Sequence, residues 1–317
     1  MRNKIDLKTN LPKTIYTDIV GLANPMLLGV TIRYYNYSDE TLYMQIVGGG
    51  TYWNNHTVNL GSLGSGNNTY ANLDNFLSRA VPAAATNETI NLTLNGYSDA
   101  NYTTLVYTFS RSVTVVFIKS NDGSWATAYN DNFDNASVMS WVCARIDAYD
   151  DSYMANLTTS TDYCISTARS LLSVEMGATT QHSGHLVNGT YIQEAYKTVS
   201  LPNNNTIYGI VNMRVGLSFA VGSGGGGSSA AEALTKIRVN IDNTNQIIQL
   251  GYAATSSLVD ILPRNRWIRI VVPLTTYKNT TVKFAVETSI RYADGGYQSG
   301  DPTLSAVYID DFKIISK

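Results

Sequence analysis

Charged side chains are scarce in this sequence. Asp, Glu, Lys and Arg make up 15% of its 317 residues and leave a net charge of −2, whereas charged residues average about 25% in soluble domains. The basic field that attracts nucleic acid or an anionic membrane surface is therefore lacking. We expect no nucleic-acid partner, and the polar surface must be built from Asn, Thr, Ser and Tyr.

Long apolar runs are also lacking. No stretch approaches the roughly 18 apolar residues that a membrane-spanning helix needs, so we expect no membrane span. The first thirty residues contain Asp6, Pro12, Asp18 and an Asn24-Pro25 break, which do not fit the basic start and apolar core of a secretory signal. Either a signal was removed, or the protein reaches the exterior another way, as virion components do when a cell lyses.

Catalytic and zinc-binding patterns are missing as well. The three histidines, His56, His182 and His185, show no metal-ligand spacing with the two cysteines. The sequence has no nucleophile elbow, no His-Glu-x-x-His and no Cys-His constellation. A glycosidase whose two carboxylates lie far apart in the chain stays open from sequence alone. We predict a protein that is not an enzyme.

The two cysteines, Cys143 and Cys164, are separated by a segment with turn and strand character. Two thiols on neighbouring strands of an exported sandwich usually pair, so we predict a disulfide. The alternative is a pair of buried free thiols.

Asn-x-Ser/Thr acceptor patterns are frequent where charge is rare. Roughly six would be expected by chance from the composition. Either the exterior is N-glycosylated, or Asn and Thr simply fill loops and solvent-facing strand positions. Both readings favour an extracellular protein. The eleven predicted acceptors are Asn36, Asn55, Asn67, Asn87, Asn91, Asn101, Asn135, Asn156, Asn188, Asn204 and Asn279.

Alternating β-branched, aromatic and polar residues with Gly, Asn or Asp at the breaks predict an all-β chain. Its length suits two antiparallel β-sandwich domains, an immunoglobulin-like one at residues 1–121 followed by a jelly roll at 122–317. In the first domain we predict a hairpin over residues 26–47. We also predict one helix over residues 70–80, where Leu73, Phe76 and Leu77 share a helical face. The glycine-rich stretch at 222–232 fits no phosphate loop and is expected to connect two strands flexibly.

The second half resembles the galactose-binding-like jelly rolls that include many carbohydrate-binding modules. The likeness is carried by DNFDNASVMSW at 131–141, YIQEAYKTVSL at 191–201, RWIRIVVPL at 266–274 and VYIDDFKII at 307–315. The resemblance implies a structural calcium ion held by acidic residues near the first strand and in the last. By position these are Asp134 with Asp310 or Asp311.

The last strand can also be read without the family. Side chains alternate with period two, which places Asp310 on the same face as Phe312 and Ile314. A carboxylate on an apolar face needs a partner or a cation, and calcium takes six to eight oxygen ligands. The alternative is that Asp310 is satisfied by hydrogen bonds to backbone amides.

Sugar binding in the resembling family uses aromatic faces beside amide or acidic groups. The candidate aromatic residues here are Tyr252, Tyr292 and Tyr297, although ordinary solvent-facing tyrosines would fit the same positions.

The expected function is a structural or attachment protein on the outside of a virion or cell, such as a spike, turret or surface-assembly subunit. Its expected partners are other copies of itself, other coat or surface proteins, and glycans. The first domain, with its apolar hairpin, would make the anchoring contacts. The alternative is a carbohydrate-binding module that accompanies a polysaccharide-degrading enzyme.

Overall fold

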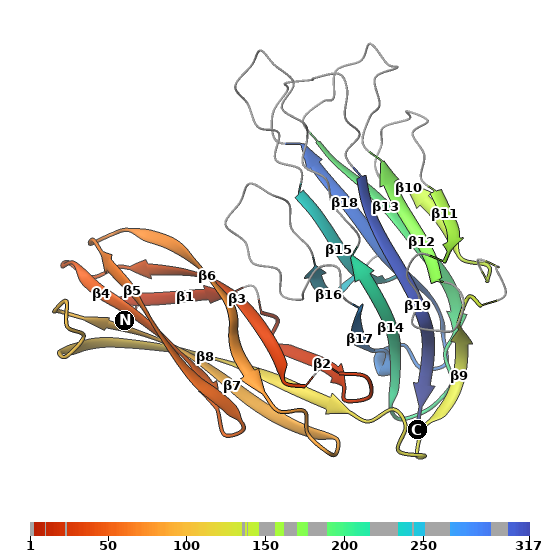
Figure 1. The fold of residues 1–317 in the computed structure, drawn as a ribbon, viewed down its shortest axis with the longest axis horizontal. Helices are drawn as coiled ribbons and strands as arrows, with labels where there is room; N and C mark the ends of the chain where they lie inside the picture. The colour runs from red at the N-terminus through yellow and green to blue at the C-terminus, as the bar shows by residue number, and fades with distance from the viewer. Residues whose placement is uncertain are drawn as a thin grey trace, which may run out of the picture. The chain divides into compact units, whose positions relative to one another are not determined.

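In the computed structural model, the regular elements of the described residues are β-strands apart from one 3-10 turn, as the alternation in the sequence predicts (Figure 1). The residues it describes are 3–9, 11–22, 24–134, 137, 139–145, 156–161, 170–176, 189–215, 234–242, 244–250, 267–292 and 304–317. They form two compact units, one up to Lys119 and one from Ser120 onward. No helix in these ranges has the length and hydropathy needed to cross a bilayer.

The first unit is a sandwich of a three-stranded and a five-stranded sheet, ordered β1-β3-β6 and β2-β8-β7-β4-β5. The latter sheet places β8-β7-β4-β5 in the order G-F-C-C′ of an immunoglobulin fold, and the former matches A-B-E, which is the strand order expected for the predicted immunoglobulin-like sandwich. The strands are β1 (Ile5–Thr9), β2 (Thr14–Asp18), β3 (Met26–Asn36), β4 (Leu42–Gly50), β5 (Trp53–Leu63), β6 (Asn68–Arg79), β7 (Thr86–Tyr97) and β8 (Leu105–Ile118).

The core of the first unit lies between these two sheets and follows the period-two pattern of the strands. Along β7, the even-numbered positions Ile90, Leu92 and Leu94 are fully buried, and the residues between them are not. Burying one such side chain contributes about 1.5 to 3 kcal/mol. Each strand thus lays one apolar row on the core and one polar row on the outside.

The predicted hairpin over residues 26–47 is wrong. Strand β3 pairs with β1 and β6, whereas β4 pairs with β5 and β7, so the chain crosses from one sheet to the other after Asn36. Strand β3 is buried along nearly all of its length. The turn residues were read correctly, but they form an arch between sheets.

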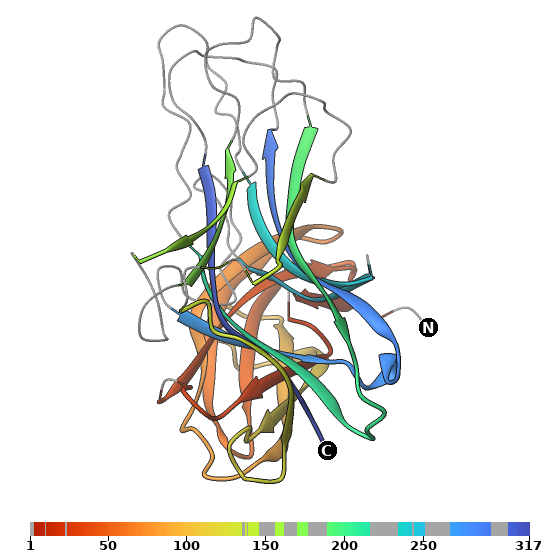
Figure 2. The same ribbon diagram turned by 90° about the vertical axis from the view of Figure 1, so that its right-hand side faces the viewer.

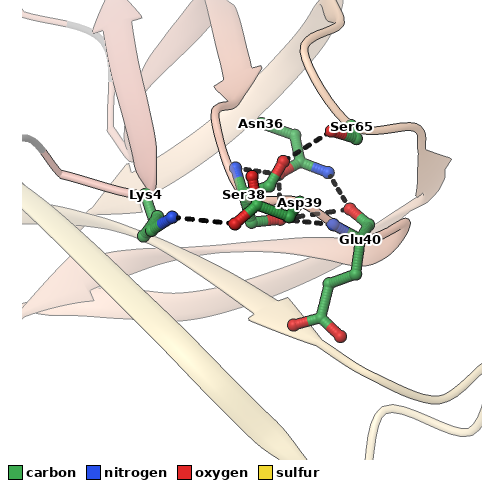
Figure 3. A network of polar contacts seen from close by, with 6 residues as sticks. All are labelled: Lys4, Asn36, Ser38, Asp39, Glu40 and Ser65. Atoms are coloured by element: carbon green, nitrogen blue, oxygen red, sulfur yellow. Dashed lines mark hydrogen bonds and ion pairs between the residues drawn. The ribbon is translucent and has the colours of Figure 1, made fainter.

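Asn36 holds this arch together (Figure 3). Its Nδ2 donates to Glu40 O at 2.8 Å and to Leu63 O at 2.7 Å, and its Oδ1 accepts from Ser38 N and Oγ at 2.9 and 2.6 Å. Both donors and both acceptor sites of the amide are therefore used. Because Leu63 ends β5 in the facing sheet, this one side chain fixes where the chain changes layers.

The predicted helix at 70–80 is also wrong, because that segment forms β6. Asn75 has a φ of +50°. Leu73 and Leu77 of β6 are four residues apart, but their partners in β3, Val30 and Leu28, are only two residues apart. This bulge turns both Phe76 and Leu77 inward after Leu73 and imitates the spacing of a helical face. A Cβ at Gly48 of the facing sheet would overlap the Phe76 ring, so glycine is needed there.

The second unit is a larger antiparallel sandwich, whose strands run from yellow-green to blue in Figures 1 and 2. Its sheets are ordered β11-β12-β19-β14-β17 and β10-β13-β18-β15-β16, and β9 pairs with β19 as a sixth strand of the first. The elements are β9 (Ala126–Asp131), β10 (Val142–Arg145), β11 (Asn156–Ser160), β12 (Ser170–Met176), β13 (Gly189–Ser200), β14 (Ile207–Val215), β15 (Leu234–Ile241), β16 (Thr244–Leu250), β17 (Trp267–Pro273), the 3-10 turn η1 (Thr275–Tyr277), β18 (Thr281–Tyr292) and β19 (Leu304–Ser316).

We predict that Asn36→Ala destabilises the first unit by about 2 to 4 kcal/mol, because it removes four hydrogen bonds of a buried amide, among them the one to Leu63 O in the facing sheet. Urea denaturation of unglycosylated protein, followed by tryptophan fluorescence, measures the change. Asn87→Ala, which truncates an exposed Asn of β7, is the matched control and should change the free energy of unfolding by less than about 0.5 kcal/mol. Equal effects from the two variants would contradict the role given to Asn36.

The turn between β7 and β8 is organised by Asp99. Its carboxylate accepts from the backbone N–H of Thr104 at 2.7 Å, and from the N–H and hydroxyl of Thr103. The backbone bond from Thr104 is the main cause that lowers the pKa of Asp99 from 3.8 to about 2. Hydrogen bonds to the ionised form favour it over the protonated form.

We predict that this turn resists acid. Because the folded pKa of Asp99 lies below its unfolded value, its stabilisation is complete above about pH 4 and is lost as the pH falls toward 2. Titration of the Thr103 and Thr104 amide resonances by NMR should give a midpoint near pH 2, and Asp99→Asn should abolish that transition. A midpoint near pH 4 would contradict the prediction.

Candidate functional site

Beside the closing strand, the structure contains a buried carboxylate that was not among the predicted calcium ligands, that of Asp131. This residue ends β9 and pairs with Phe312 of β19, so its side chain lies on the core face. It is 1% exposed. Tyr129 donates its hydroxyl to the Asp131 carboxylate at 2.8 Å, and Trp141 donates Nε1 to Oδ2 at 2.8 Å.

The cation at this carboxylate is Lys197 of β13, in the facing sheet. Its Nζ lies 3.6 Å from Asp131 Oδ2, 5.1 Å from the centre of the Tyr129 ring, and donates to Met139 O. The Asp131 group, defined as Asp131, Lys197, Tyr129 and Trp141, thus joins the two sheets through their core. Burial, followed by the hydrogen bond and the charge of Asp131, raises the pKa of Tyr129, so this hydroxyl stays a donor at neutral pH.

Asp310 does not share a face with Phe312, which corrects the reading from simple alternation. Opposite β14, Ile210 pairs with Lys313 and Asn212 with Asp310, so β19 holds one extra residue, and Asp311 has a φ of +51°. Gly209 of β14 faces the core, where an added Cβ would meet Phe284 and Ile314. Asn212 is three residues after Gly209, so its side chain points to the opposite side of the sheet, away from the core. Asp310 pairs with Asn212 and therefore points to that same side.

The three predicted calcium ligands are therefore placed differently from one another. Asp310 is buried and accepts from the backbone N–H of Asp311 at 2.8 Å. Asp311 lies 3.7 Å from Lys313 Nζ, and Asp134 accepts from Asn132 Nδ2 at 2.9 Å. Within the described ranges no three His, Cys, Asp or Glu side chains gather as a metal site. The calcium role stays a prediction.

The first unit contains a second buried carboxylate with the same kinds of partner. Glu88 of β7 accepts from Trp53 Nε1 at 3.1 Å and from Arg79 Nε at 2.6 Å, and Arg79 Nη2 binds its other oxygen. Arg79 comes from β6, in the sheet that faces β7. We call this the Glu88 group; like the Asp131 group, it joins the two sheets of its sandwich.

Several other predicted site residues fall outside what the structure describes. Cys143 lies in β10, but Cys164 is outside the described residues, so their disulfide stays a prediction. Tyr252 and Tyr297 are also outside them, and Tyr292 is the last residue of β18. The sugar-binding role of these three tyrosines is likewise untested.

The predicted glycan acceptors divide by exposure. Asn36 is fully buried and its Nδ2 makes two hydrogen bonds, so it cannot carry a glycan in this fold. Asn204 is half-buried, Asn156 is placed only as the first residue of β11, and Asn135 and Asn188 are outside the described residues. The exposed acceptors are Asn55, Asn67, Asn87, Asn91, Asn101 and Asn279.

An outward face that the sequence did not reveal carries the chemistry of a binding surface. On the side of β1-β3-β6 away from the core, one cross-strand row is Lys8, Arg33 and Tyr70, and the next is Asp6, Tyr35 and Asn68. We call these six residues the tyrosine–arginine face.

Arg33 is held at the centre of this face. Its Cζ lies 5.2 Å from the centre of the Tyr35 ring and 5.0 Å from that of Tyr70, and its Nε and Nη2 donate to Asn68 Oδ1 at 2.9 and 2.8 Å. Lys8 Nζ lies 5.4 Å from the Tyr35 ring, and Tyr37 stacks on that ring at 5.5 Å. Cation–aromatic contacts of this kind are worth about 0.5 to 1 kcal/mol at exposed sites.

The sequence contained a signal for this face that motif reading missed. In each of the segments Arg33-Tyr-Tyr35 and Asn68-Thr-Tyr70, the first and third residues lie on the same side of a strand and carry polar or aromatic side chains. Only the pairing of β3 with β6, across 31 intervening residues between Asn36 and Asn68, brings them together.

No protein-family model matches the sequence, and no curated protein matches it. Among solved structures, the chain is similar to the carbohydrate-binding module TmCBM61 in complex with beta-1,4-galactotriose, with 9% identity, 59% of this chain and 94% of that chain covered, and a TM-score of 0.32. A carbohydrate-binding module of the beta-sandwich superfamily matches with 10% identity, coverage of 98% and 97%, and a TM-score of 0.33.

The cleaved adhesin domain of Lys-gingipain from Porphyromonas gingivalis matches with 13% identity, 62% of this chain and 99% of that chain covered, and a TM-score of 0.32.

We predict that Lys197→Met destabilises the second unit by about 3 to 5 kcal/mol, because it leaves the Asp131 carboxylate buried without its cation. Lys278→Met, at an exposed lysine after η1, should have little effect. The double variant Asp131→Asn with Lys197→Met should lose less than the sum of the single variants, as measured by urea denaturation. Additive losses would show that the pair is not coupled.

Thermal melts of the wild type with and without EDTA test the calcium prediction for Asp134, Asp310 and Asp311. A lower melting temperature of the wild type in EDTA, restored by added calcium, would support bound calcium. An unchanged melting temperature, together with elemental analysis that finds no metal, would contradict it.

Proposed function

We propose that this chain is a non-enzymatic attachment or structural protein on the exterior of a virion or cell, which contacts glycans through its first unit. The observation that carries the proposal is the tyrosine–arginine face. Aromatic rings, an amide and a guanidinium lie together there on an outward sheet face, and these are the groups that bind sugars by stacking and hydrogen bonding.

The distribution of the acceptor asparagines supports an exterior location. Six of them are exposed, and they lie on β5, β7 and three connecting segments. Glycans at these positions would coat several sides of a sandwich without disturbing its core, because each side chain already points to solvent. The sparse charge and the abundance of Asn, Thr and Tyr fit such a surface.

The partners of two buried carboxylates, Asp131 and Glu88, support a structural role for those acids. Asp131 and Glu88 are each bound by a tryptophan N–H and by a cation from the facing sheet. A general acid or nucleophile must instead reach a substrate. These groups stabilise the sandwiches, which is consistent with the proposal that the protein is not an enzyme.

Assembly with other copies or with other coat proteins is the second part of the proposal. Leu105 and Val106 at the start of β8 are exposed by 53% and 38%, respectively, and give the first unit an apolar edge for protein contact. A spike, turret or surface-filament subunit would use such an edge.

The alternative is a carbohydrate-binding module that accompanies a polysaccharide-degrading enzyme. It shares the glycan contact with the main proposal but requires no assembly. The two therefore differ in where the native protein is found and in its association state.

We predict that the native protein is found on particles or cell surfaces and that the purified chain binds glycans on an array. Cryo-electron microscopy or surface proteolysis of native material tests the location. A soluble monomer found only in culture fluid beside a polysaccharide hydrolase would favour the alternative. If neither the unglycosylated nor the glycosylated protein bound any glycan on the array, the glycan contact would be contradicted in the main proposal and in the alternative.

A further inference from the structure

The free edge of Arg33 identifies the chemistry that the tyrosine–arginine face can bind. Asn68 Oδ1 occupies the edge of the guanidinium formed by Nε and Nη2. The edge formed by the two terminal nitrogens, Nη1 and Nη2, keeps its outward N–H groups for another acceptor. Two parallel N–H donors match the two oxygens of a carboxylate, which makes this edge a bidentate site.

The charge of the face favours an anion. Its rows contain two cations, Lys8 and Arg33, and one carboxylate, Asp6, whose Oδ1 accepts from the N–H of Leu7. In the part of the chain that the structure describes, no carboxylate forms an ion pair with Lys8 or Arg33. An incoming carboxylate would therefore meet positive charge that is not already paired.

The neutral groups of the face favour a sugar over an acidic peptide. Along β6 the outward side chains are Asn68, Tyr70 and Asn72, all exposed, so a phenol ring stands between two amides on one straight row. The Tyr70 ring is 48% exposed. The C–H face of a pyranose stacks on such a ring while its hydroxyls bond the flanking amides, whereas extended peptides use pairing at a sheet edge.

The Tyr35 ring makes the face rigid before any ligand binds. It is 8% exposed and lies under Arg33 and Lys8, with Tyr37 stacked beside it. Because Arg33 is fixed by two rings and by Asn68, little side-chain entropy remains to be lost on binding. A preorganised guanidinium beside an exposed ring is a built recognition element.

We propose that the tyrosine–arginine face binds a carboxylate-bearing sugar, with the carboxylate on the free edge of Arg33, Lys8 as a second cation, and the sugar ring on Tyr70. This inference rests on the proposed glycan contact and deepens it by naming the site and the class of ligand. It concerns residues of the first unit, which the sequence assigned to anchoring.

Calorimetry of the full, unglycosylated chain with three probes tests the ligand class: an oligogalacturonate, the same oligomer with its carboxyls methyl-esterified, and a sialylated oligosaccharide. We expect binding of at least one acid probe, at least tenfold weaker binding of the ester than of its acid, and weakening by salt. Equal affinity for acid and ester, or binding of neither acid probe, overturns the anionic class.

Variants test the site. Arg33→Gln and Tyr70→Ala should each weaken binding of the acid probe at least tenfold, and Arg33→Lys should restore only part of the loss because it lacks the bidentate edge. Tyr52→Ala is the matched control, because Tyr52 is an exposed tyrosine with an arginine, Arg79, 5.4 Å from its ring, outside the face. Circular dichroism and melting temperature confirm that each variant is folded.

The outcomes separate the site from the proposed function. Glycan binding on the array that is unchanged by Arg33→Gln and Tyr70→Ala would overturn this site and leave the proposed function standing. If the wild-type protein bound no glycan at all, both the site and the proposed glycan contact would be overturned. Stronger binding of poly-glutamate than of either acid sugar would assign the face to an acidic protein partner and overturn the sugar proposal.

Discussion

A buried carboxylate that is shared between a tryptophan N–H and a cation of the facing sheet is the interaction on which both sandwiches depend. In the first unit Glu88 lies between Trp53 and Arg79, and in the second Asp131 lies between Trp141 and Lys197. Removing a charge from water costs several kcal/mol unless partners replace the water. Only one alignment of the two sheets supplies both partners, so the polar group and the apolar core constrain the same arrangement.

Because the stabilising contacts of each sandwich lie between its two sheets, the outward faces of the sheets are available for recognition. The tyrosine–arginine face is one such outward face. Strands β1, β3 and β6 bury Ile5, Leu7, Ile32 and Leu73 on one side, and the alternating side chains on the other side then form straight cross-strand rows. The rigidity that the core gives to these rows makes Arg33 a fixed donor in place of a mobile surface side chain.

The same alternation explains which predictions failed. Each failure occurs at an extra residue or at a change of sheet. The bulge at Asn75 placed Leu73, Phe76 and Leu77 at helical spacing within a strand, and the bulge at Asp311 moved Asp310 to the face opposite Phe312. At Asn36 the turn residues were recognised, but nothing local distinguishes a hairpin from an arch between sheets. A buried amide with four satisfied hydrogen bonds is visible only after folding.

The sequence by itself determined the all-β class, most long strands and the need for a partner at a carboxylate on an apolar face. These features depend on period-two patterns and on desolvation, which act within a few residues. The tertiary structure alone decided that Asp131 is bound by Lys197 of the facing sheet and that Arg33 contacts the Tyr70 ring. Those contacts join residues far apart in the chain, and strand pairing and bulges set them through register.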